Sequence, residues 1–93
     1  MYKLVYRFHA LQRMLQRSIS EDEIAFIIQN HPTILEEYPQ DLPYPSQLVL
    51  GQIGKKSLHI VLAINDAEKE FIIITVYEPD PTLWTHDFTK RRS

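Results

Sequence analysis

Five side chains in this sequence are of the kinds that cleave a phosphodiester bond without a metal ion: His9, Arg13, Arg17, His59 and Tyr77. Cleavage of RNA in this way needs a base for the 2′-hydroxyl proton, cations for the oxyanions and an acid for the leaving 5′-oxygen. Guanidinium groups match phosphate oxygens, and histidine titrates near neutral pH. If these residues cleave RNA, we expect the histidines to act as acid and base and the arginines to bind the phosphate. Tyr77 would donate a proton or stack on a base.

The residues near the N-terminus also have a structural interpretation. His9 lies one helical turn before Arg13, where a solvated residue at a helix start is equally expected. Arg13 and Arg17 are four residues apart on one helix face and repel each other unless an anion lies nearby. That anion is either an RNA phosphate or a carboxylate of this chain, for which Glu36 and Glu37 are the candidates.

The structural alternative is the favoured one for His59, which lies in an apolar strand. If the last hairpin closes at residues 66–69 without irregularity, His59 pairs with Val76 and points away from Tyr77. A bulge of one residue reverses this relation. Trp84 is expected to cover the edge of the core rather than to stack on a base.

The elements that position these residues follow from the periodicity of apolar side chains. The pattern predicts a helix over 9–17, a second helix from Ser20 to Asn30, and strands over 2–8, 33–38, 47–53, 58–65 and 71–78. The first helix is expected to bury Phe8, Leu11 and Leu15. The order predicts an α+β fold in which two N-terminal helices pack on one face of a mostly antiparallel, four- to five-stranded, curved sheet.

The start of the second helix has the strongest local signal. Ser20 followed by Glu23 forms a capping box, in which each side chain accepts a hydrogen bond from the other residue's backbone amide. Ile19 is expected to pack on Ile24 as a hydrophobic staple. The acidic residues after Ser20 are therefore interpreted as helix-start residues rather than metal ligands.

Composition limits the classes of function. The chain has 93 residues, no cysteine and a net charge of −2, so disulfide scaffolds and thiolate metal sites are excluded. Its four histidines lack the spacing of a metal site, and no nucleotide-binding motif is present, so we expect neither metal nor cofactor. No apolar run suits a membrane span. We expect a cytoplasmic protein with a single domain over 1–88 and a basic, disordered tail over 89–93.

Residues 9–20, HALQRMLQRSIS, resemble the H-A-x-x-R-M-x-x-R-x-I-S opening of the family called domain of unknown function 4258. Residues 58–61, residues 75–80 and Trp84 are similar to the closing pattern of that family. The resemblance spans about residues 8–84. The family is similar in layout to the RelE/ParE/BrnT group of small toxins, many of which are ribonucleases held in check by an antitoxin.

The resemblance implies a toxin-like endoribonuclease with RNA or the ribosome as its target and an acidic antitoxin as its partner. The chain departs from the group in being mildly acidic rather than strongly basic. The alternative is a non-catalytic protein-binding module that keeps only the RelE-like fold. Such a module, or a homodimer, would use an exposed edge strand at 2–8 or 33–38.

Overall fold

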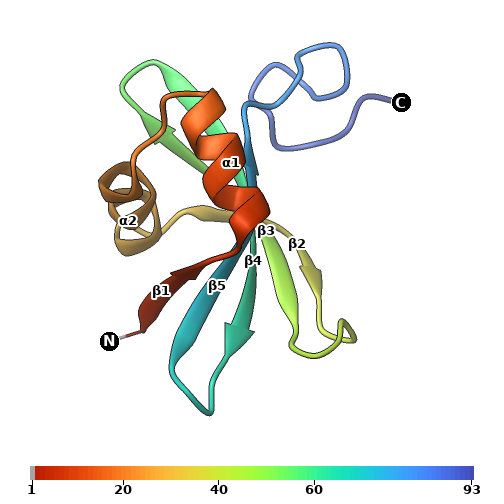
Figure 1. The fold of residues 1–93 in the computed structure, drawn as a ribbon. Helices are drawn as coiled ribbons and strands as arrows, with labels where there is room; N and C mark the ends of the chain where they lie inside the picture. Colours follow the sequence, from red (N-terminus) through yellow and green to blue (C-terminus); the bar gives the residue numbers. More distant parts are fainter. Residues whose placement is uncertain (1) are drawn as a thin grey trace.

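The computed structural model describes residues 2–93 and confirms an α+β fold with the predicted order of elements (Figure 1). The elements are β1 (Lys3–Tyr6), α1 (Phe8–Gln16), α2 (Glu21–Gln29), β2 (Thr33–Tyr38), β3 (Ser46–Ile53), β4 (Lys56–Asn65) and β5 (Glu70–Tyr77). Among residues 2–93, no helix is both long and apolar enough to cross a membrane.

The five strands form one open, mixed sheet in the order β1-β5-β4-β3-β2. Strands β2 to β5 are an antiparallel meander, as expected from the short turns between β3, β4 and β5. Strand β1 departs from this pattern because it lies parallel to β5. The chain passes through both helices and the meander before it returns beside β1 in the same direction, so β1 and β2 are the two edges of the sheet.

One face of the sheet packs against the helices and forms the main core. Strand β4 contributes Leu58, Ile60 and Leu62 to this core, and both helices contribute side chains to the same cluster. Helix α2 approaches β3 closely at Gly51, where an added Cβ would lie 2.2 Å from Cγ2 of Ile27. The absence of a side chain at Gly51 therefore sets how closely α2 packs on the sheet.

Helix α1 buries a different stripe from the predicted one. Ala10 and Met14 are buried, whereas Phe8, Leu11 and Leu15 have exposed fractions of 75%, 39% and 84%. The reason is the connection from β1. The backbone N–H of Arg7 still donates to the carbonyl of Ile73 at 3.0 Å, and the helix begins at the next residue. This short link fixes the rotation of α1 and turns its smaller apolar stripe toward β5.

The turn between the helices is a Schellman motif followed by a capping box. The amide of Ile19 donates to the carbonyl of Met14 at 2.8 Å, and Ser18 has a φ of 57° in the left-handed region. Ser20 then accepts from the Glu23 amide while the Glu23 carboxylate accepts from the Ser20 amide. The predicted capping box is confirmed, and Ile19 is buried as a member of the core cluster.

A β-bulge in β5 changes the register of the last hairpin. His59 pairs with Tyr77 and Val61 with Thr75, but Leu62 pairs with Ile73, which leaves Ile74 as the extra residue. The predicted pairing of His59 with Val76 is therefore wrong. The bulge shifts β5 by one position and places Tyr77 on the same face of the sheet as His59.

Residues 78–93, which we call the C-terminal segment, turn back on themselves after β5 and end far from the N-terminus (Figure 1). Within it, Trp84 forms a β-bridge with Arg91, and the amide of Arg92 donates to the carbonyl of Leu83 at 2.8 Å. The amide of Thr85 donates to the carbonyl of Lys90, also at 2.8 Å. Residues 90–92, expected to belong to a disordered tail, thus take part in backbone hydrogen bonds with this segment.

Candidate functional site around His59

His59 lies on the face of the sheet that points away from the helices. Its neighbours Leu58 and Ile60 belong to the helix-side core, and successive residues of a strand point to opposite faces. Leu50 of β3 and Tyr77 of β5 pair with His59 and share its face. The C-terminal segment covers this position, because the ring of Trp84 contacts the imidazole edge-to-face at 4.4 Å.

The imidazole of His59 is fully buried, with an exposed fraction of 0%, and both ring nitrogens have partners. Nε2 lies 2.9 Å from the carbonyl of Phe88, and Nδ1 lies 3.2 Å from the hydroxyl of Tyr77. A carbonyl only accepts, so Nε2 carries the proton and the tyrosine donates to Nδ1. Burial lowers the pKa of His59, which favours this neutral tautomer.

Phe88 presents its carbonyl to His59 from an unusual backbone conformation. Its φ is 62°, in the left-handed region that a bulky side chain rarely adopts. The hydrogen bond from His59 and the one from the amide of Phe88 to the carbonyl of Thr85, at 2.8 Å, hold this conformation in place. The hydrogen bond from His59 to Phe88 therefore holds the C-terminal segment against the sheet.

A charged pair lies beside the imidazole. Nε of Arg91 is 3.4 Å from Oε2 of Glu36 on β2, and the Arg91 guanidinium stacks on the Trp84 ring at 4.6 Å from its centroid. The hydroxyl of Tyr38 donates to Glu36. These side chains, with His59 and Tyr77, form what we call the His59 cluster: Glu36, Tyr38, His59, Tyr77, Trp84 and Arg91.

The electrostatics of the His59 cluster favour a fixed ion pair beside neutral polar groups. The hydrogen bond from Tyr38 and the guanidinium of Arg91 hold the pKa of Glu36 below its usual range. Burial raises the pKa of Tyr77, and the bond to Glu36 raises that of Tyr38. Near neutral pH the carboxylate is ionised, both phenols are protonated and the imidazole is neutral. Proton transfer from His59 to a substrate requires the C-terminal segment to move away.

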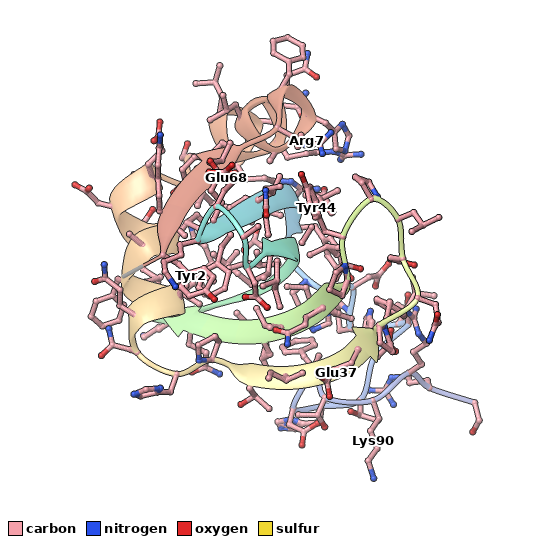
Figure 2. All side chains as sticks on the ribbon, turned by 90° about the horizontal axis from the view of Figure 1, so that it is seen from below. Tyr2, Arg7, Glu37, Tyr44, Glu68 and Lys90 are labelled. Carbon is pink, nitrogen blue, oxygen red and sulfur yellow. The ribbon has the colours of Figure 1, made fainter. Side chains whose placement is uncertain are left out.

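The structure brings together two of the five residues singled out in the sequence, His59 and Tyr77. The other three, His9, Arg13 and Arg17, belong to α1 or follow it directly, on the other side of the sheet. Figure 2 shows this separation, with Arg7 at the start of α1 and Lys90 of the C-terminal segment on opposite sides of the strands.

The anions expected beside the arginines are not the ones found. Arg17 lies 3.8 Å from Glu78, the residue after β5, rather than beside Glu36 or Glu37. Glu36 instead pairs with Arg91. Within residues 2–93, Arg13 has no ion-pair partner. Of these two arginines only Arg17 reaches a carboxylate, and the phosphate-binding role expected for the pair stays a prediction.

Sequence reasoning missed four members of the His59 cluster as site residues: Glu36, Tyr38, Trp84 and Arg91. Glu36 and Arg91 are 55 positions apart, and no motif links them. One signal for this site was present in the sequence. His59 interrupts an apolar strand and Trp84 follows a proline-rich turn, but the two residues were considered separately. Their contact depends on the path of residues 78–93, which no periodicity describes.

The described residues 2–93 contain no group of three or more His, Asp or Glu side chains placed to hold a metal ion. No curated protein and no solved structure is significantly similar to the chain. The pattern of the family described as Domain of unknown function (DUF4258) matches residues 6–78, which includes both helices and all of β2 to β5. The chain therefore belongs to the DUF4258 family.

Proposed function

We propose that this domain binds a partner protein through the exposed side of α1. The observation that carries the proposal is the row formed by Phe8, Leu11 and Leu15, which we call the α1 outer face. Phe8 and Leu15 have exposed fractions of 75% and 84% although they are large and apolar. An apolar row on a helix that the fold leaves uncovered is typical of a protein interface.

The geometry of the His59 cluster supports a binding domain over an enzyme. Trp84 covers the imidazole of His59, and both ring nitrogens are hydrogen-bonded, to the hydroxyl of Tyr77 and the carbonyl of Phe88. A group that acts as an acid or base must reach the substrate proton directly or through one water. The cluster therefore supports the fold on one face of the sheet, while α1 offers a surface on the other.

Site-specific photo-crosslinking in the native cell tests this proposal. A photoreactive residue at position 15 is expected to trap one protein, and the same residue at exposed position 55, in the turn between β3 and β4, is expected to trap none. The adduct from position 15 is expected to disappear when Phe8→Glu is added. Identical adducts from both positions, or an adduct that survives Phe8→Glu, would refute the α1 outer face as the binding surface.

We propose, as the second candidate, a metal-independent endoribonuclease similar in layout to the RelE-like toxins. The observation that favours it is the β5 bulge, which brings the imidazole of His59 and the phenol of Tyr77 together beside the ion pair of Glu36 and Arg91. Groups with shifted pKa values gather at functional sites more often than elsewhere. In this reading Trp84 and Phe88 move off the imidazole while Arg91, released from Glu36, binds the phosphate. His59 or Glu36 then takes the 2′-hydroxyl proton, and Tyr77 protonates the leaving 5′-oxygen.

Induced expression with mapping of messenger RNA ends tests the second candidate. If it is right, growth stops and new RNA ends appear, and both effects are lost in Arg91→Ala. Arg13→Ala is the matched control, because it also removes a guanidinium but on the other side of the sheet. Normal growth and unchanged RNA ends with soluble, folded protein present would refute the activity.

A further inference from the structure

We propose that the α1 outer face binds an amphipathic helix whose polar flanks are acidic. This inference rests on the proposed binding function and adds the chemistry of the partner. Phe8, Leu11 and Leu15 follow the i, i+3, i+7 spacing and fall within about 60° of one another around the helix axis. Such a narrow row along an exposed helix suits a second helix that packs lengthwise against it.

The charge beside the α1 outer face indicates the sign of the charge expected on the partner's surface. Of the basic residues between Tyr2 and Ser20, Arg7 lies beside this face, whereas Arg13 and Arg17 lie on the opposite side of α1. Arg7 is exposed and lies four residues before Leu11, so its guanidinium flanks the apolar row. Within residues 2–93, Arg7 has no ion-pair partner. An acidic side chain beside the partner's apolar stripe would neutralise this cation.

The same charges argue against a second copy of this chain as the occupant. A symmetric dimer places the same surface on both sides of the interface. Two α1 helices packed along this face would each place Arg7 at the interface without a carboxylate from residues 2–20 to pair with it. A charge left unpaired at an interface opposes association. An acidic helix from another protein meets both requirements of the surface, the apolar row and the cationic flank.

Two synthetic helical peptides test the inference directly. Both are about 20 residues long, so that they form helix in isolation, and both carry the same leucine stripe. One has glutamates and the other lysines beside that stripe. By titration calorimetry at low salt, the acidic peptide is expected to bind at least about tenfold more tightly than the basic one. Added salt is expected to reduce this difference because it screens exposed charges.

Three variants complete the design. Arg7→Glu is expected to reverse the preference between the peptides, and Leu15→Glu to abolish binding of both. Lys55→Glu, an equal charge change on the β3–β4 turn, is expected to change neither affinity. Because Leu15 and Arg7 are exposed, these variants are expected to keep the fold, which circular dichroism verifies.

Each contrary result overturns a separate claim. Equal affinity for the acidic and basic peptides would refute the acidic partner. Binding of neither peptide, with the position-15 adduct still formed in cells, would refute the acidic helix and leave the proposed binding function standing. Loss of both peptide binding and the adduct would refute the two together. A dimer by sedimentation that Leu15→Glu dissociates would identify a second copy as the occupant instead.

Discussion

Replacement of His59 by alanine is expected to lower the free energy of unfolding by about 3–5 kcal/mol. The imidazole makes two hydrogen bonds, to Phe88 and Tyr77, each of which contributes about 1 kcal/mol. Its edge-to-face contacts with Trp84 at 4.4 Å and Tyr77 at 5.2 Å add about 0.5–1.5 kcal/mol each. A loss of this size is a large part of the roughly 5–15 kcal/mol that stabilises a domain.

Urea unfolding measures this loss, and the single tryptophan makes the assay specific. Trp84 is 3% exposed and touches His59, so its fluorescence reports on the C-terminal segment, while far-ultraviolet circular dichroism reports on the sheet and helices. Tyr77→Phe removes only the bond to Nδ1 and is expected to lose about 1 kcal/mol. His9→Ala, at an exposed position, is expected to stay within about 0.5 kcal/mol of the parent. If His59→Ala lowers the free energy of unfolding by less than about 1 kcal/mol, the role of His59 in holding the C-terminal segment against the sheet is refuted.

Three further results are expected. Because the pKa of His59 is lowered by folding, the unfolded chain takes up a proton below about pH 6.5 that the folded chain does not. The free energy of unfolding should therefore fall between pH 7.5 and pH 5.5, and by less in His59→Gln, as urea titrations at both pH values would reveal. Ser18→Gly should raise the free energy of unfolding by about 1 kcal/mol, seen as a higher Tm, since glycine adopts a φ of 57° without strain. Gly51→Ala should lower the free energy of unfolding by about 1–3 kcal/mol in urea titrations. Ile27→Ala, which removes both γ carbons that the new Cβ would meet, should cost less in Gly51→Ala than in the parent; no effect of Gly51→Ala would contradict the close contact of α2 with β3.

The helices and strands were predictable because their signals are local. The capping box at Ser20 needs only residues three positions apart, and it appears in the structure as expected. The turn at Gly54 needs one residue with a positive φ, and Gly54 has a φ of 59°. Strand β1 was placed correctly along the chain, but its parallel pairing with β5 depends on contacts between residues nearly 70 positions apart. No local pattern encodes a pairing of that range.

The candidate site was less predictable because it depends on one irregular residue. An alternating pattern gives the face of each side chain only while the register is unbroken. The bulge at Ile74 breaks it, and His59 meets Tyr77 rather than Val76. The sequence of β5 is a run of apolar residues that fits either register equally well. The ion pair of Glu36 and Arg91 then follows from the tertiary path of the C-terminal segment alone.

The prediction that α1 buries Phe8, Leu11 and Leu15 is wrong because of the rotation of this helix, and the row left exposed bears on function. The helix carries two apolar rows, one of Ala10 and Met14 and the other of Phe8, Leu11 and Leu15. Area alone favours burial of the larger row, since hydrophobic stabilisation grows with the apolar surface removed from water. The fold buries the smaller row, because the short link after β1 fixes the rotation and Ala10 lets α1 lie close to β5. The larger row contributes little to folding while it stays in water, and this exposed apolar row is the observation behind the proposed binding to a partner.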